Sequence, residues 1–374
     1  DMMITCQLGS GAVPTFVGLD KGQNDSHSPA TNIYRPVKGL LYESPGSAAI
    51  GMLFCEYYKN THNNDALTAA MKIRRFLEQR IIPENQWYDY ETFYSCTAYA
   101  LRYKEDHLRD PYTLCLPQNN MSIYWAADFY RLLYTCTDNR DILQMGRYLL
   151  DYLLLYQQVW NPPFLSFWGL GGFGCQNTDA EWSDTRQGLF ARELIEYFFE
   201  TGHEEYLERG IMAMKASFVL MLHERHKEIA PGNFRWAVPD DFGVILENYG
   251  HTGMDFPVPG VVTPDWGLCT AMLAYIWLFE KLGDLCISLY SKKAYGVNGC
   301  AVKGIKCEIP EIQIELDILP EKQKFAIHIL VPIDATAEFK QYTTLKVRNV
   351  KTHKDHQIAI AHSQEYQWLY LNKD

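Results

Sequence analysis

Residues 132–153 read LLYTCTDNRDILQMGRYLLDYL, and the spacing of apolar residues in this stretch decides the fold. An apolar segment that ends in leucine and tyrosine meets a short polar break at Thr137. Beyond the break, Leu143, Leu149 and Leu153 recur at positions that share one face of a helix. The stretch therefore predicts two helices joined by a turn of a few residues, which is an αα-hairpin.

The same design occurs twice more in the chain. Residues 56–77 (EYYKNTHNNDALTAAMKIRRFL) and residues 196–218 (EYFFETGHEEYLERGIMAMKASF) each contain a polar break between two helical patterns. A fourth copy begins in residues 265–284, where Gly283 takes the position of Gly202 in the third copy, and the pattern then stops. Such repeats predict a helical array in which each pair buries its apolar faces against its neighbours.

The segments that lead into the hairpins are much longer than the turns inside them. They cover residues 1–46, 80–119, 157–183 and 223–263. Because each long segment leads into the first helix of a pair, stacking the pairs side by side places all of these segments at one end of the array. Loops on a rigid scaffold commonly carry function, so we expect the functional site at that end.

From about residue 300 the apolar period changes from helical to two. Residues 312–318 and 325–331 alternate between apolar and polar side chains, as short strands do. The glycines between residues 296 and 304 are interpreted as a linker. We therefore predict an αα-hairpin domain over residues 1–290 and a small antiparallel β-sandwich over residues 300–374, which acts as a support module.

Composition and charge argue against several classes of protein. The formal net charge of −11 offers no basic footprint for a phosphate backbone, so nucleic acid is not an expected partner. The chain contains no apolar run long enough to span a membrane, and its first residues lack the basic start and apolar stretch of a signal peptide. The 10 cysteines form no C-x-x-C pair, which argues against zinc fingers and redox motifs.

Aromatic residues make up 14% of the chain, and rings with a polar edge suit contacts with sugars. An array of αα-hairpins with long aromatic loops at one end, followed by a β-sandwich, resembles the six-hairpin or (α/α) toroid carbohydrate-active enzymes. These include glycoside hydrolases, unsaturated glucuronyl hydrolases and α-barrel polysaccharide lyases. The resemblance rests on the layout of the repeats and indicates no particular family. It implies a mainly α fold, an (α/α) toroid or incomplete barrel, with activity on glycans.

The first candidate cluster is GGFGCQNTDAEWSDTRQ, residues 171–187. Asp184 and Gln187 have the spacing of a capping box, so they are interpreted as the start of a helix. Asp179 and Glu181 precede this cap, and we predict that their carboxylates are catalytic. Three neighbouring side chains are predicted to bind substrate: Trp168, Trp182 and Arg186.

The second cluster is ENYGHTGMD, residues 247–255. Tyr249, His251 and Asp255 share this loop with two glycines that permit sharp turns, and they are predicted to be catalytic. Two further residues are predicted to bind substrate: Asn248 and Trp266.

The predicted cleft is made by residues 86–96, 168–187 and 247–266, and residues 117–120 form a further candidate group. Tyr88 and Asp89 belong to a run of aromatic and acidic residues that either lines the cleft or packs under the hairpins. Gln118 lies at a helix start, where an amide either caps the helix or binds a sugar hydroxyl. We predict that these three residues bind substrate.

Two chemistries suit these residue types. Glycoside hydrolysis needs a carboxylic acid that protonates the leaving oxygen and a carboxylate that activates water or attacks carbon, and the loop acids supply such a pair. β-Elimination from a uronic acid polymer needs a base such as Tyr249 or His251, with neutral or cationic neighbours such as Asn248 and either Arg186 or Arg235. An acidic protein does not attract a polyanion through its overall field, so hydrolysis is preferred.

A third interpretation is a protein that binds glycans or other proteins without catalysis. No cofactor and no metal is expected, because the sequence contains no spaced set of histidines and cysteines. A carbohydrate is the expected partner, and the oligomeric state is not indicated. Because the expected substrate is a glycan and the chain starts at Asp1 rather than Met, a periplasmic or secreted location is expected.

Overall fold

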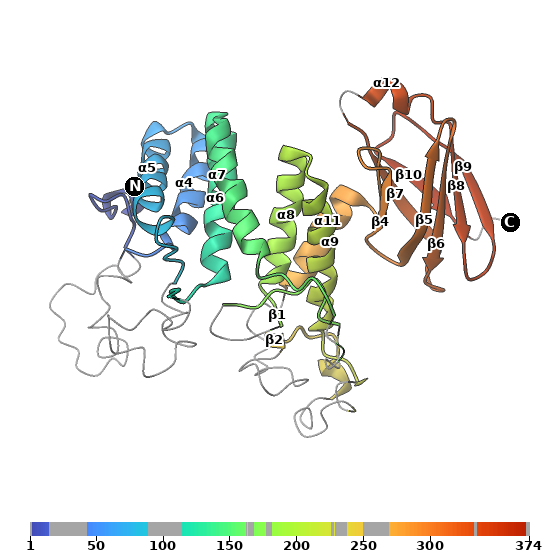
Figure 1. The fold of residues 1–374 in the computed structure, drawn as a ribbon, viewed down its shortest axis with the longest axis horizontal. Coiled ribbons are helices and arrows are strands. Elements are labelled where there is room, and N and C mark those ends of the chain that lie inside the picture. The colour runs from blue at the N-terminus through green and yellow to red at the C-terminus, as the bar shows by residue number, and fades with distance from the viewer. Residues whose placement is uncertain are drawn as a thin grey trace.

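The structure is a computed structural model, and it places the helices before most of the strands along the chain (Figure 1). It describes residues 2–14, 43–88, 114–161, 163, 168–176, 182–225, 228, 238–249, 269–332 and 335–371. The described helices are α1 (Met2–Thr5), α4 (Ser47–Thr61), α5 (Asn64–Phe76), the π-helix η2 (Leu77–Ile81), α6 (Asn120–Thr137), α7 (Arg140–Leu154), α8 (Gln187–Thr201), α9 (Glu204–Val219), the 3₁₀ turn η5 (Pro239–Asp241), α11 (Thr270–Leu282) and α12 (Thr336–Phe339).

The three predicted hairpins are confirmed, and all three turn in the same way. Each first helix ends in a threonine whose hydroxyl donates to the carbonyl four residues back: Thr61, Thr137 and Thr201. The next residue is left-handed and its N–H closes the last helical turn: His62, Asp138 and Gly202. The residue after that has an extended backbone and is the N-cap of the second helix. Each pair is therefore antiparallel and its turn is short.

The fourth repeat ends differently. Gly283 follows α11 with φ 68° and ψ −159°, and the chain continues into the strand β3 (Leu285–Ser288) instead of a second helix. A strand therefore begins inside the range predicted for the helical domain. Within the described residues, α11 is the last helix of the array.

The first helices of successive pairs pack on one another in a row, from α4 through α6 and α8 to α11 (Figure 1). Glycines allow close contact at two of these junctions. A Cβ at Gly51 would lie 2.6 Å from the ring of Phe129 on α6, and a Cβ at Gly188 would lie 2.7 Å from the carbonyl oxygen of Thr270 on α11. A helical array is thus confirmed, and the described helices form a row rather than a closed ring.

A buried ionic cluster joins α6 to α8. The Arg131 guanidinium donates to Asp128 Oδ1 and to Glu193 Oε1, each at 2.7 Å, and Glu193 is 1% exposed. Burial, opposed by Arg131 and reinforced by Asp128, raises the pKa of Glu193 from 4.5 to about 8. One arginine between two carboxyl groups is neutral when Glu193 keeps its proton, which avoids a net charge in the interior. The Tyr197 hydroxyl adds a second link from α8 by donating to the Ala127 carbonyl at 2.8 Å.

The C-terminal strands form two four-stranded sheets whose side chains share a buried core. The strands are β3 (Leu285–Ser288), β4 (Lys293–Gly296), β5 (Cys300–Glu308), β6 (Glu311–Ile318), β7 (Lys324–Leu330), β8 (Thr344–Asn349), β9 (Asp355–Ala359) and β10 (Tyr366–Tyr370). One sheet has the order β10-β7-β3-β4 and the other the order β5-β6-β8-β9. The alternating residues of β6 put Ile312, Ile314 and Leu316 into the shared core, as the sequence predicts.

Two predictions for this part of the chain are wrong. The sheets are mixed rather than antiparallel, because β3 pairs with β7, and β6 with β8, in parallel. After β6 the chain crosses to β7 in the other sheet and returns at β8, so β8 runs in the same direction as β6. The glycines at 296 and 304 do not form a linker, because they lie in β4 and β5.

The strands β3 and β4 dock on the beginning of α9. Glu204 accepts hydrogen bonds from the hydroxyls of Ser291 and Tyr295, at 2.7 and 2.8 Å. Lys293 forms an ion pair of 2.6 Å with Glu208 one turn further along α9. These polar contacts connect the sheets to the third hairpin.

The long connecting segments share one end of the array, as predicted, as far as the structure describes them. The short hairpin turns lie at one end, and the two-stranded ladder of β1 (Ser183–Asp184) and β2 (Asn248–Tyr249) lies at the other (Figure 1). We call the end with the ladder the loop end. No helix within the described ranges is both long and apolar enough to cross a bilayer.

We predict that Glu193 makes the stability of the protein depend on pH. Because its pKa is raised in the folded state, the native protein binds a proton that the unfolded chain releases above pH 4.5. The free energy of unfolding should therefore fall as the pH rises from 4.5 to about 8. The Glu193→Gln variant, which mimics the protonated acid, should lose this slope in urea titrations across the range.

The matched control is Glu200→Gln, near the end of the same helix, which should keep the slope of the parent protein. An unchanged slope in Glu193→Gln would show that the carboxyl group titrates normally.

Candidate functional site

Hydrogen bonds connect the loop segments to one another at the loop end. The Gln118 side chain donates to the Asn85 carbonyl at 2.8 Å, and the Asn119 N–H donates to the Trp87 carbonyl at 3.1 Å. The start of α6 is thus fixed to the segment that follows the first hairpin. Residues 86–96 of the predicted cleft and the candidate group 117–120 meet here through their described residues.

The start of α6 also holds the glycine-rich segment. Asn119 forms an isolated β-bridge with Gln176, and the Asn120 N–H donates to the Cys175 carbonyl at 2.9 Å. Further back, Gln158 and residues 171–172 exchange two backbone hydrogen bonds of 2.8 Å, so residues 157–161 and 168–173 form two facing arms. The loop after α7 is therefore held at both of its ends.

The two main clusters of candidate residues are brought together by β1 and β2. In this ladder Ser183 pairs with Tyr249, and Asp184 pairs with Asn248. The next residue extends it, because the Thr185 N–H donates to the Glu247 carbonyl at 2.8 Å. Segments more than sixty residues apart in the sequence thus become neighbours.

The start of α8 differs from the predicted capping box. Asp184 Oδ1 accepts from the Arg186 N–H at 2.8 Å, as an N-terminal cap would, and Asp184 Oδ2 pairs with the Arg186 guanidinium at 3.2 Å. Gln187 does not reach back to the Asp184 N–H. Its side chain binds the Ser183 hydroxyl and accepts from the Phe173 N–H at 2.8 Å, so it joins the glycine-rich arm to α8. The Arg186 guanidinium also contacts the Cys175 sulfur.

Several predicted substrate-binding residues belong to the buried floor of the loop end. Four of them are almost fully buried: Tyr88, Gln118, Arg186 and Asn248. Trp182 is half-buried, and Trp168 is 57% exposed. The structure places the backbone of Tyr249 in β2. Six predicted residues lie outside the described part of the chain: Asp89, Asp179, Glu181, His251, Asp255 and Trp266.

Three features of the loop end were not predicted as part of the site. Trp160 is 53% exposed on the arm that faces the arm of Trp168. Gln176 is 4% exposed, and neither end of its amide has a hydrogen-bond partner among the residues that the structure describes. The adjacent acids Asp240 and Asp241 lie in η5, the yellow turn at this end in Figure 1. In the sequence, the run PDD at 239–241 and the tryptophan at 160 could have indicated two of these features.

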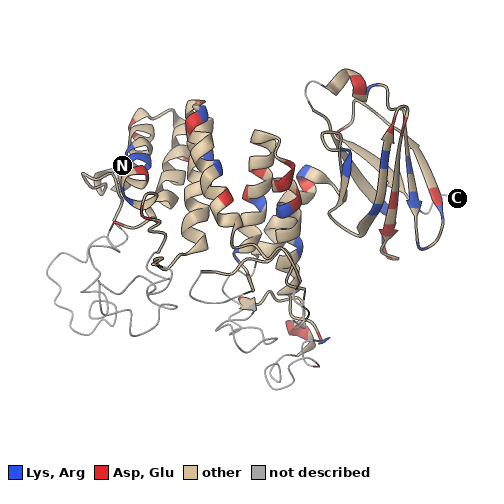
Figure 2. Cartoon of the chain, viewed as in Figure 1, with Lys and Arg blue, Asp and Glu red and all other residues tan. Residues whose placement is uncertain are grey.

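The described side chains at the loop end can offer a ligand hydrogen bonds and aromatic ring surface, but little positive charge. An unpaired buried amide costs about 1–3 kcal/mol, which a water molecule or a ligand hydroxyl at Gln176 would offset. Burial raises the pKa of Tyr152, whose hydroxyl donates to Gln118 Oε1 at 3.2 Å, so this tyrosine is not suited to be a base. Basic and acidic residues are interspersed along the described helices and strands (Figure 2).

Across the described ranges, no group of three or more histidine, cysteine, aspartate or glutamate side chains gathers as metal ligands would.

Solved structures similar to this chain include enzymes that act on sugars. The α-1,6-mannanase of Salegentibacter sp. HEL1_6 is 12% identical, with a TM-score of 0.39 over 62% of this chain and 54% of the mannanase. A D-mannose isomerase is 13% identical, with a TM-score of 0.38 over 64% of this chain and 60% of the isomerase. A polysaccharide lyase is 11% identical, with a TM-score of 0.27 over 49% of this chain and 29% of the lyase.

The sequence predicted a resemblance to carbohydrate-active enzymes of the (α/α) toroid type, and solved structures of a mannanase, a mannose isomerase and a polysaccharide lyase are among those similar to this chain. The chain spans about half the length of the mannanase. No family model and no curated protein sequence matches the chain. At these TM-scores the likeness does not identify a reaction.

We predict that Asp184 is essential to the floor of the loop end. In Asp184→Ala the buried Arg186 guanidinium loses its carboxylate, which should lower the free energy of unfolding by about 3–5 kcal/mol. The midpoint of urea unfolding measures this loss if the slope of the transition stays constant. In the double variant Asp184→Ala/Arg186→Met the buried guanidinium is absent together with its carboxylate, so part of the stability should return.

The control is Asp240→Ala, which removes an exposed carboxylate from the same end and should change stability by less than about 0.5 kcal/mol. Equal effects of Asp184→Ala and Asp240→Ala would contradict the role given to the buried pair.

Proposed function

We propose that the protein is a glycoside hydrolase that binds an oligo- or polysaccharide at the loop end of its helical array. The observation that carries this proposal is the convergence of the described loop segments at one end of the array. Gln176 is bridged to Asn119, and Trp182 leads directly into β1. Asp179 and Glu181 stand between Gln176 and Trp182 in the sequence, and we propose that they supply the catalytic carboxylates.

Ring surface and amides at the same end favour a sugar as the ligand. Trp160 and Trp168 expose their indoles on facing arms of one loop, and indole faces pack well on the C–H faces of sugar rings. The unpartnered amide of Gln176 follows on the second of these arms and matches the hydrogen-bonding needs of a hydroxyl-rich ligand. Apolar platforms next to a few polar groups are the usual composition of a ligand site.

In the proposed reaction, one of the two acids protonates the glycosidic oxygen and the other assists water or attacks the anomeric carbon. In the sequence Tyr249, His251 and Asp255 follow Asn248, which pairs with Asp184, and we assign these three residues supporting roles in catalysis. The substrate-binding roles of Asp89 and Trp266 also remain proposals. Buried Asn248, Gln118 and Tyr88 then act by positioning the loops.

The charge of the described residues favours hydrolysis over elimination. A lyase needs a cation or neutral donor that binds the uronate and stabilises the enolate. Of the two sequence candidates for this task, Arg186 is buried and already paired with Asp184, and Arg235 lies outside the described residues. Hydrolysis of a glycosidic bond does not need a group that binds a uronate or stabilises an enolate.

We predict that Asp179→Asn and Glu181→Gln each lower kcat by about a hundredfold or more, because each removes a proton donor or acceptor. Release of reducing ends from a panel of neutral and acidic polysaccharides measures the activity, and ultraviolet absorbance of the products detects unsaturated uronyl groups. New reducing ends without new absorbance are expected.

The matched control is Asp138→Asn at the opposite end of the array, where asparagine tolerates the left-handed backbone and activity should not change. Full activity in both amide variants would refute the roles of the two acids, and products that absorb would identify a lyase.

We predict that Trp160→Ala and Trp168→Ala weaken substrate binding more than they slow the reaction. Loss of one ring contact should raise KM about 2- to 12-fold with little change in kcat. Steady-state kinetics on the best substrate of the panel measure both constants. Trp368→Ala, which removes an exposed indole from β10, is the control and should leave KM unchanged. A KM that responds equally to all three changes would argue against a platform at the loop end.

A further inference from the structure

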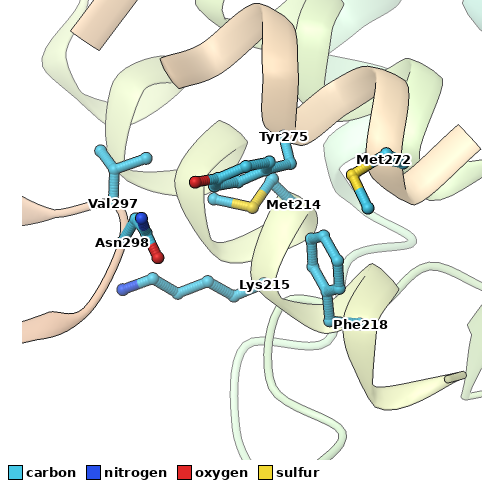
Figure 3. Close-up of a pocket in the computed structure, with 7 residues that line it drawn as sticks. All are labelled: Met214, Lys215, Phe218, Met272, Tyr275, Val297 and Asn298. Atoms are coloured by element: carbon cyan, nitrogen blue, oxygen red, sulfur yellow. The ribbon is translucent and has the colours of Figure 1, made fainter. Parts of the chain in front are cut away.

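A pocket of about 300 Å³ lies where α9 and α11 meet the turn between β4 and β5 (Figure 3). Much of its lining is apolar, with Met214 and Phe218 from α9, Met272 from α11 and Val297 from the turn. This volume is at the lower end of the range for sites that bind small molecules. The pocket therefore suits a compact ligand with a substantial apolar part.

The polar groups of the pocket gather on one side. In Figure 3 the amine of Lys215 and the hydroxyl of Tyr275 extend toward Asn298, whereas Phe218 and Met272 lie on the opposite side. Asn298 is held in place by its side chain, which donates to Asp284 Oδ1 at 2.8 Å. A ligand that fits both sides has one polar end and one apolar end.

Lys215 supplies the charge of this polar side. The nearby Lys293 is paired with Glu208, and the charge of Asp284 is balanced by Lys322. In contrast, no described carboxylate is among the groups that influence Lys215, and desolvation by its apolar neighbours lowers the pKa of its amine. Lys215 is exposed as a residue, so a ligand can reach the amine from solvent.

We propose that this pocket binds a small carboxylate with an apolar body, whose carboxylate meets Lys215 and Tyr275 while its apolar part lies between Phe218 and Met272. A carboxylate restores the counter-ion that the ammonium lacks and accepts a hydrogen bond from the tyrosine. A single lysine without an arginine suits a monoanion better than a phosphate. The proposal does not depend on the glycan-hydrolase function.

Binding of such a ligand would also connect the two parts of the chain. Its apolar body would contact α9 and α11, and its carboxylate would lie next to the turn between β4 and β5. A ligand that binds only the folded protein raises the midpoint of thermal unfolding.

The test uses 6-phenylhexanoate as the probe, titrated into the full chain by calorimetry. Saturable binding is expected, and Lys215→Met should weaken it about tenfold or more through loss of the charge-assisted contact. Lys215→Arg should retain most of the affinity. Met272→Trp should abolish binding, because the larger ring fills the pocket. Lys303→Met, which removes an exposed lysine from β5, is the control and should bind as the parent protein does.

Two further probes separate the contributions of charge and apolar area. The neutral 6-phenylhexanamide should bind the parent protein more weakly than the acid does. The amide and the acid should bind Lys215→Met with equal affinity, and acetate should bind neither protein. The proposal is overturned if the acid does not bind, or if acid and amide bind alike and Lys215→Met has no effect. Thermal unfolding of each variant without probe checks that the fold is retained.

Discussion

The buried contact of Arg131 with Asp128 and Glu193 is the constraint on which the helical part depends. The first two hairpins bury apolar faces against each other in the usual way, but the junction from α6 to α8 carries charge in its interior. Such a cluster costs free energy unless every hydrogen bond is made and the net charge is zero. These directional contacts therefore restrict how the second hairpin can be placed against the third.

The same two helices begin at the loop end, and their relative position therefore sets the frame of the candidate site. Asn119 and Asn120 at the start of α6 hold the glycine-rich segment, and Asp184 at the start of α8 holds the strand of Asn248. This floor is built from buried polar side chains, whose hydrogen bonds have preferred directions, and not from apolar contacts alone. Directional contacts hold loops in one arrangement, which a catalytic pair of acids requires.

The β part completes the array where a fourth hairpin would otherwise continue. Gly283 turns the chain from α11 into β3, and β3 and β4 then dock on the beginning of α9 through Glu204. The last helix of the described array thus has a sheet beside it in place of a second helix. One result of this substitution is the pocket of Lys215 and Tyr275, whose walls come from helices and from a strand turn together.

The sequence by itself determined the elements that depend on local spacing. Apolar residues at helical intervals, the threonine that ends each first helix and the alternation in β6 predicted the hairpins and strands, because each is a property of neighbouring residues. The sequence also indicated that the long segments share one end, which follows from the order of short and long connections. Tertiary structure alone decided the parallel pairing of β6 with β8, the burial of Arg186 and Asn248 in the floor, and the pairing of Gln158 with residues 171–172. These depend on contacts between residues far apart in the chain, and no local pattern records which distant partner a side chain will meet.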